Sequence, residues 1–192
     1  MEVKSPKPPR LTMNMKPDGK SRMKQYAPYL RMLFRVKETI QRTLIQKHQI
    51  YCQAGELGNS AVIKLQKNSW TDDGFEQGVF FSVWVGEKEL KKNRFNYNIH
   101  ALKLRLRKGY AIKPREFASS FRTRLKASNV QWPHLRTDYG PLTLMQGWVD
   151  LDIKTFEQDV LKLLDDFVGI HEIIDEMLDE RRKYNSQSRY DA

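Results

Sequence analysis

The sequence predicts an α+β fold: a small, mainly antiparallel sheet with flanking helices and a long C-terminal helix. Two patterns in the 192 residues support this prediction. Four segments alternate apolar and polar residues, as half-buried strands do, and three repeat apolar residues at steps of three or four, as amphipathic helices do. Their order is helix, hairpin, strand, helix, strand, helix. An antiparallel or mixed sheet with helices on one face is the natural packing for this order.

Composition supports a folded core. The chain is 40% hydrophobic and 30% charged, and its nine Phe, eight Tyr and four Trp provide large side chains to bury. A wholly disordered chain is therefore not expected. No apolar run approaches the roughly 18 residues of a membrane span, and residues 1–6 lack the apolar run of a secretory signal. We therefore expect a soluble cytoplasmic protein without a membrane partner.

The composition of the two ends of the chain predicts its domain organisation. Residues 1–24 contain four prolines and seven Lys or Arg, which predicts a disordered basic arm. Residues 185–192 are expected to be a frayed tail. The segment between them, 25–184, is long enough for a single α+β domain.

The net charge of +11 is unevenly distributed. Residues 101–126 carry nine Lys or Arg against Glu116 alone, whereas residues 151–192 carry six against eleven acidic residues. This asymmetry suggests that one side of the protein faces a polyanion. The alternative is a basic protein that lysines merely keep soluble.

The first predicted helix spans residues 28–50. Pro28 suits the first helical position, where its missing N–H has no partner to lose. Gly55 and Gly58 then predict a loop. The apolar residues of this helix are Leu30, Leu33, Phe34, Ile40 and Leu44.

A β-hairpin is predicted next, over residues 61–70 and 77–86. The first segment alternates apolar and polar side chains. In the second, apolar side chains at every second position alternate with Phe80, Ser82 and Trp84. The turn signal 71–74 separates the two segments. A third strand is predicted over 98–107, where three leucines alternate with three cations. A helix over 115–127 follows, with apolar side chains at every fourth residue.

The last two predicted elements are a strand over 142–153 and a helix from Thr155 to about Lys183. Thr155 and Gln158 have the spacing of a capping box, in which side chains satisfy free backbone donors. A heptad-like apolar seam follows, which packs on the domain's own sheet or joins a homodimer or a protein partner. Its members are Phe156, Val160, Leu163, Phe167, Ile170, Ile174 and Met177.

Residues 62–86 resemble small bacterial domains of unknown function. The phrase Leu65-Gln66-Lys67-Asn68-Ser69-Trp70 ends one strand, and a short acidic turn leads to a second strand that ends in Gly86. The resemblance implies an α+β fold and a bacterial or phage origin. It brings no established activity and no catalytic residues.

The basic block 101–126 is the first candidate site. If 98–107 is a strand, Lys103, Arg105 and Arg107 lie on one face at intervals of about 6.6–6.8 Å and can follow a phosphate backbone. Arg122 and Arg124 add positive charge from the next helix. The alternative is a solvated sheet face, or one balanced by the acidic C-terminal helix. Unpaired bases would stack on Tyr97, Tyr110 or Trp132.

A metal-dependent nuclease is the second hypothesis. Asp150 and Asp152 share a predicted strand face, and Lys154 completes an acid-x-Lys triplet. Carboxylates hold magnesium, and a lysine stabilises charge or orients the attacking water. A further ligand would come from Asp138, Asp72 or Asp73. The alternative for Asp152 is a favourable position before a helix N-terminus.

The sequence shows no other chemistry. No two of the four histidines have metal-ligand spacing, and Cys52 can form neither an internal disulfide nor a several-cysteine zinc site. Glycine-rich nucleotide loops are absent, so no cofactor is expected. The prediction is a binding module for nucleic acid or another polyanion, with a nuclease or a protein-interaction module as alternatives.

Overall fold

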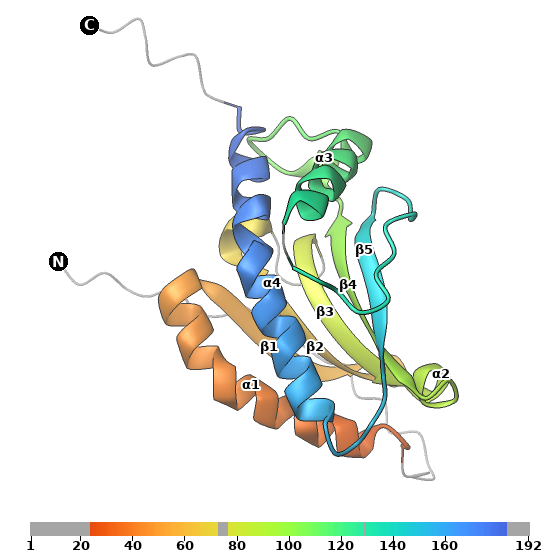
Figure 1. The fold of residues 1–192 in the computed structure, drawn as a ribbon. Coiled ribbons are helices and arrows are strands. Elements are labelled where there is room, and N and C mark those ends of the chain that lie inside the picture. The colour runs from red at the N-terminus through yellow and green to blue at the C-terminus, as the bar shows by residue number, and fades with distance from the viewer. Residues whose placement is uncertain (1–23, 73–76, 129, 184–192) are drawn as a thin grey trace, which may run out of the picture.

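The computed structural model describes residues 24–72, 77–128 and 130–183 (Figure 1). Within them lies a five-stranded sheet in which each strand is antiparallel to the next in the chain. This confirms the predicted antiparallel sheet with flanking helices and a long C-terminal helix. The elements are α1 (Ala27–His48), β1 (Ile50–Leu57), β2 (Ser60–Lys67), β3 (Gly78–Gly86), α2 (Glu87–Leu90), β4 (Arg94–Leu102), α3 (Pro114–Ala127), β5 (Thr143–Asp150) and α4 (Phe156–Asp179).

The helices α1, α3 and α4 lie on one face of the sheet (Figure 1). Helix α1 packs on β1 and β2, and α4 contacts both α1 and α3. Between these helices and the sheet lies the apolar core, where the ring of Phe167 on α4 stacks on Phe81 of β3 with centroids 4.8 Å apart. All seven residues of the predicted seam on α4 are buried. The seam is therefore part of this domain's own core.

The second face of the sheet carries none of these three helices (Figure 1). Strand residues point alternately to the two faces. Ile63, Phe81 and Ile99 belong to the core cluster, so their neighbours in the chain point to the second face. This second face carries the candidate site.

Strand β1 replaces a predicted loop. Its core-facing residues are Ile50, Cys52 and Ala54, which give a weak apolar signal. Leu57 pairs with Ser60, so the two-residue turn at Gly58 closes a tight hairpin. Gly58 has a φ of +57°, a value that glycine adopts without strain. The loop predicted from Gly55 and Gly58 is thus confirmed as a turn at Gly58, but the sequence did not predict strand β1 before it.

The strand predicted over 98–107 is wrong in its second half. Strand β4 ends at Leu102, and Lys103 takes a left-handed conformation with φ +55° that turns the chain. A 3-10 turn, Leu104–Leu106, follows. Leu104 is buried whereas Leu106 is 64% exposed, so the leucines do not share a face. Lys103, Arg105 and Arg107 consequently do not line a strand.

The predicted capping box of the last helix is absent. Thr155 already has nearly helical backbone angles, and its side chain caps no free N–H of α4. Its hydroxyl donates instead to the Asp159 carboxylate at 2.7 Å. The start of the helix is nevertheless where the sequence predicts it.

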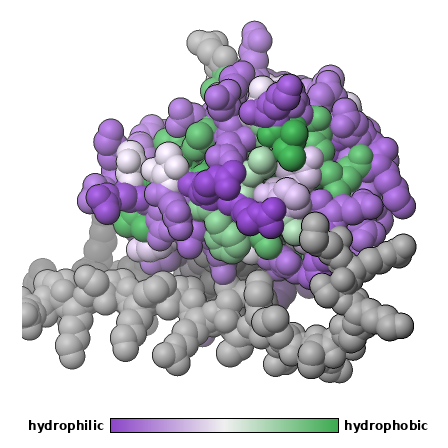
Figure 2. Space-filling model, turned by 90° about the horizontal axis from the view of Figure 1, so that it is seen from below, coloured by the Kyte–Doolittle hydropathy of each residue, from purple (hydrophilic) through white to green (hydrophobic). Residues whose placement is uncertain are grey.

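The predicted basic arm, apart from Lys24, and the predicted tail over 185–192 lie outside the described residues. No helix in the described part of the chain is long and apolar enough to cross a membrane. The face seen in Figure 2 is mainly hydrophilic, with apolar side chains in separate spots.

Candidate nucleic-acid interface

Arg107 has a structural role. Its side chain is only 7% exposed and pairs with Asp72, while the guanidinium also donates to the Ser69 carbonyl. It lies 4.0 Å from the centroid of the Tyr110 ring. These contacts fasten the segment after β4 to the segment after β2, so Arg107 is not presented to a ligand.

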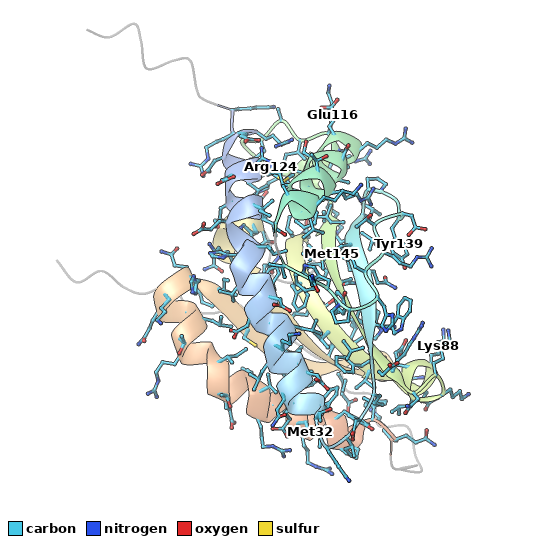
Figure 3. The ribbon with its side chains drawn as sticks, viewed as in Figure 1. Met32, Lys88, Glu116, Arg124, Tyr139 and Met145 are labelled. Atoms are coloured by element: carbon cyan, nitrogen blue, oxygen red, sulfur yellow. The ribbon has the colours of Figure 1, made fainter. Side chains whose placement is uncertain are left out.

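Arg122 also has a structural role. From α3 its guanidinium donates to the carbonyls of the turn that leads into β5, at 2.7 Å to Tyr139, 3.2 Å to Gly140, 2.9 Å to Thr143 and 3.1 Å to Leu144. Because one side chain satisfies four acceptors, Arg122 organises this turn. Tyr139 lies on that loop beside β5 (Figure 3).

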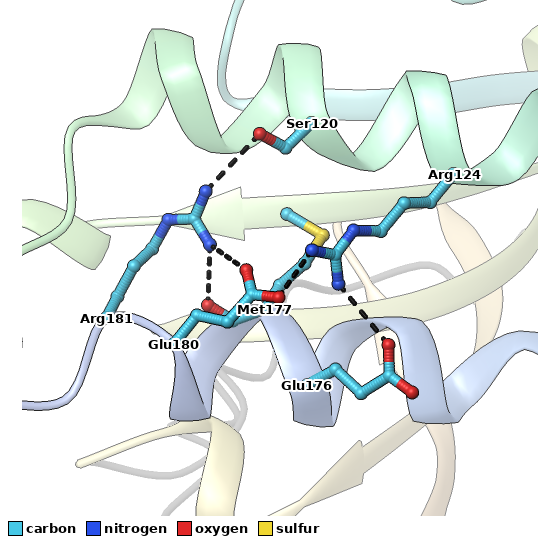
Figure 4. A network of polar contacts seen from close by, with 6 residues as sticks. All are labelled: Ser120, Arg124, Glu176, Met177, Glu180 and Arg181. Atoms are coloured by element: carbon cyan, nitrogen blue, oxygen red, sulfur yellow. Dashed lines mark hydrogen bonds and ion pairs between the residues drawn. The ribbon is translucent and has the colours of Figure 1, made fainter.

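Arg124 is balanced by the acidic C-terminal helix, as the alternative interpretation of the basic block predicts. It reaches from α3 to Glu176 at 3.3 Å and to Glu180 at 2.5 Å (Figure 4). The bond from Arg124 lowers the pKa of Glu180. Arg181 joins the network through Glu180 and the Ser120 hydroxyl. The network fastens α3 to α4.

Lys103 and Arg105 differ from these three arginines. Both are exposed, and within the described residues neither side chain has a hydrogen bond or an ion pair. Arg105 lines a surface hollow of about 420 Å³, which we call the basic hollow. Its other lining residues are Lys113, Pro114, Arg115, Glu116 and Pro141. Lys113 pairs with Glu116 at 2.9 Å, and these two charges cancel. Arg105 and Arg115 then leave the hollow with a net positive charge.

A second hollow, of about 440 Å³, lies on the second face of the sheet. We call it the sheet hollow. The alternation of strand residues explains its lining, because β2, β3 and β4 each contribute every second side chain. The lining residues are Leu57, Ser60, Val62, Lys64, Phe80, Ser82, Trp84, Asn98, His100 and Leu102.

The strand register aligns these side chains in rows. Lys64, Ser82 and Asn98 are direct neighbours on β2, β3 and β4. In the next row Trp84 lies beside Asn96. Adjacent strands are about 4.8 Å apart, so polar and aromatic groups lie side by side across the face.

A one-way hydrogen-bond chain forms part of the sheet hollow. The Ser82 hydroxyl donates to Asn98 Oδ1 at 2.6 Å, and Asn98 Nδ2 donates to His100 Nε2 at 2.8 Å. Since Nε2 accepts, His100 carries its proton on Nδ1, which donates to the Leu142 carbonyl at 3.1 Å. Burial lowers the pKa of His100, and Lys64 lowers it further, against the opposing effect of the Leu142 carbonyl. His100 is therefore held neutral.

Aromatic rings complete the sheet hollow. The Phe80 ring packs edge-on against His100 with centroids 5.6 Å apart, and Lys64 Nζ lies 4.9 Å from the Phe80 centroid. Trp84 is partly exposed. The hollow thus combines the partly exposed Trp84 ring, hydrogen-bonding groups and a cation, which suits a flat polar ring near a negative charge.

The linings of the sheet hollow and the basic hollow are close along the chain. Leu102 lines the sheet hollow, and the exposed Lys103 follows it directly. On the other side Leu142, which accepts from His100, follows Pro141 of the basic hollow. Two short stretches of chain therefore connect the lining of the sheet hollow to the exposed cations.

The stacking residues suggested by the sequence lie elsewhere. Tyr97 and Trp132 are in the core, where the Tyr97 hydroxyl donates to the Pro133 carbonyl at 2.6 Å and burial raises its pKa. Tyr110 is covered by Arg107 and Arg182. Phe80, Trp84 and His100 were missed. The available signal was the alternation of polar Asn96, Asn98 and His100 with apolar residues in β4.

The nuclease candidates do not converge. Asp150 ends β5 exposed and opposite Arg94, while Asp152 lies in the following turn, where its carboxylate accepts the Lys154 backbone N–H at 2.8 Å. No group of three His, Cys, Asp or Glu side chains in residues 24–72, 77–128 and 130–183 could hold a metal ion. The further ligands suggested by the sequence are already engaged or not described: Asp138 pairs with Arg136, Asp72 with Arg107, and Asp73 lies outside the described residues.

Comparisons with known proteins give no family. No protein-family model matches the chain, and no curated protein or solved structure is significantly similar to it. The resemblance of residues 62–86 to small bacterial domains stays a prediction. A proposal of function therefore depends on the geometry of the two hollows alone.

Proposed function

We propose that the protein is a binding module for single-stranded nucleic acid. In this proposal a base enters the sheet hollow while the phosphates lie along the exposed cations of the basic hollow. The observation that carries the proposal is that two short stretches of chain, Leu102–Arg105 and Pro141–Leu142, connect the linings of the two hollows.

The chemistry of the sheet hollow favours a base. Bases offer a flat π-face to a ring such as the partly exposed Trp84, and stacking contributes about 1–3 kcal/mol per base. Their edges carry donors and acceptors that suit the remaining capacity of Ser82 and Asn98. A volume of about 440 Å³ is also within the usual range for small-molecule sites.

The exposed cations favour the phosphates. Lys103, Arg105 and Arg115 are exposed without side-chain partners in the described part of the chain, and the protein is strongly basic. Each neutralised phosphate releases counterions, so binding should weaken steeply with salt. A duplex hides its base faces, and the proposal therefore favours a single strand over a duplex.

Fluorescence anisotropy tests the proposal. Labelled 12-nucleotide single strands of RNA and DNA and a matched duplex would be titrated at low and at physiological salt. The expected result is salt-sensitive binding that is stronger for single strands. Absence of binding to any single strand at low salt, or equal binding to the duplex, would contradict the proposal.

Charge-matched variants locate the contacts. Replacing Lys103 and Arg105 with Gln should weaken binding about 10-fold. The control replaces Arg31 and Arg42 on α1, which are exposed and carry the same total charge. Equal losses in the two double variants would show that only net charge matters.

A further inference from the structure

A second aromatic stack lies on β5, outside the sheet hollow. Trp148 stands in the same row as Trp84, two strands away, with Asn96 between them. The His134 ring lies parallel to Trp148, at an interplanar angle of 1° and a centroid distance of 4.7 Å. The Arg94 guanidinium is 4.9 Å from the Trp148 ring.

His134 adopts an unusual backbone conformation to reach this position. Its φ is +46°, in the left-handed region that non-glycine residues seldom occupy and that costs free energy. Neighbouring contacts hold it there. The Pro133 carbonyl accepts from Tyr97, and Arg136 exchanges two backbone hydrogen bonds with Gln146 of β5, at 2.8 and 3.0 Å. The strained residue is thus fixed from both sides.

The stack is presented rather than buried. His134 is exposed and Trp148 is partly exposed, whereas the rings of Tyr97 and Trp132 are in the core. Arg94 contacts Trp148, and the exposed Lys91 and Lys92 precede β4. Two carboxylates also lie nearby, since Asp150 is opposite Arg94 and Glu89 accepts from Asn96 at 3.1 Å. A strained, exposed ring on a rigid aromatic support, with the Arg94 guanidinium beside it, is the arrangement of a base-stacking platform.

We propose that His134 and Trp148 form a second base-binding platform, so that the ligand is a strand that crosses the sheet from Trp84 toward β5. This inference rests on the proposed function. The two tryptophans are two strand spacings apart, about 9.6 Å. Stacked bases are about 3.4 Å apart, so a stacked strand needs about three steps to reach both platforms, one more than a 3-nucleotide strand has.

His134→Asn tests the platform, because Asn tolerates a left-handed backbone and lacks the ring. Gln131→Asn, at an exposed position of the same loop, is the control. Anisotropy would be measured with single strands of 3 and 12 nucleotides, alongside melting temperatures. We expect His134→Asn to weaken binding of the 12-mer about 10-fold and to reduce the advantage of the 12-mer over the 3-mer. The control should stay within about 2-fold, and both melting temperatures within about 4 °C of the parent.

Three results would overturn the inference in distinguishable ways. If His134→Asn binds the 12-mer as the parent does while Trp84→Ala binds it weakly, the platform is wrong and the proposed function stands. If the parent protein binds neither strand, the proposed function and the platform both fail. Trp148→Phe, which keeps an aromatic support, should bind better than Trp148→Leu; equal binding by these two would also contradict the platform.

Discussion

Asn98 donates from Nδ2 to Nε2 of His100 at 2.8 Å, and this bond determines which nitrogen of the imidazole carries the proton. A protonated His100 would place an N–H against the N–H of Asn98. The Ser82 hydroxyl, which donates to the other end of the same amide, holds Asn98 in place. The sheet hollow is therefore built around a neutral histidine.

The first prediction concerns pH. The folded-state pKa of His100 lies below its ordinary value of 6.5, so the unfolded chain binds the proton first as the pH falls. The stability associated with a neutral His100 is present above pH 6.5 and is lost as the pH falls below it. Urea unfolding at pH 7.5 and 5.5 should show a smaller loss in His100→Gln than in the parent.

The pKa of His48 is also lowered, but equally in the parent and in His100→Gln. The difference in stability loss between these two proteins therefore reports on His100. An identical loss of stability in the parent and in His100→Gln would refute the assignment.

The second prediction concerns the seam of α4. Phe167 is fully buried and stacks on Phe81, so Phe167→Ala should cost about 3–5 kcal/mol of unfolding free energy. Phe167→Glu, which buries a charge, should unfold the domain. Phe34, which is 41% exposed on α1, provides the control, and Phe34→Ala should cost less than about 1 kcal/mol. A folded Phe167→Glu protein that loses only a binding partner would instead make the seam an interface.

The third prediction separates two arginines of the basic block. Arg122→Ala removes the donors of four carbonyls and should cost about 2 kcal/mol in denaturant unfolding. Arg105→Ala should leave stability within about 0.5 kcal/mol, since its side chain has no partner in the described residues. Anisotropy should show that Arg105→Ala weakens binding. A stability loss in Arg105→Ala with none in Arg122→Ala would contradict the structural role of Arg122 and the exposed role of Arg105.

The fourth prediction concerns cleavage. Because Asp150, Asp152 and Lys154 do not converge with a further carboxylate, magnesium should leave a bound strand intact on a denaturing gel. Cleavage that depends on magnesium and is lost in Asp152→Ala would restore the nuclease hypothesis.

The sequence predicts those elements whose signal lies within a few neighbouring residues. The seam of α4 has a long, regular period, and the β2–β3 hairpin has strong alternation, so both were found. Strand β1 was missed because Cys52 and Ala54 are weak apolar markers beside Gly55. The alternation from Leu102 to Arg107 was misleading, because the left-handed Lys103 turns the chain and the 3-10 turn after it buries Leu104 but exposes Leu106.

The site is harder to predict because its partners are distant in sequence. Arg124 meets Glu176 and Glu180, which are 52 and 56 residues further along the chain, so nothing local distinguishes it from the exposed Arg105. The sheet hollow exists only once β2, β3 and β4 are in register. Charge alone indicated the neighbourhood of the basic hollow but not the aromatic residues of the sheet hollow.

The most direct test of the central claim is an NMR titration of the isotope-labelled protein with an unlabelled 12-nucleotide single strand. We expect the largest shifts at the Trp84 indole N–H, the Asn98 side-chain amide and the His100 ring, with backbone shifts at Lys103 and Arg105. Shifts confined to the solvent-facing residues of α1, with the sheet hollow unchanged, would contradict the claim.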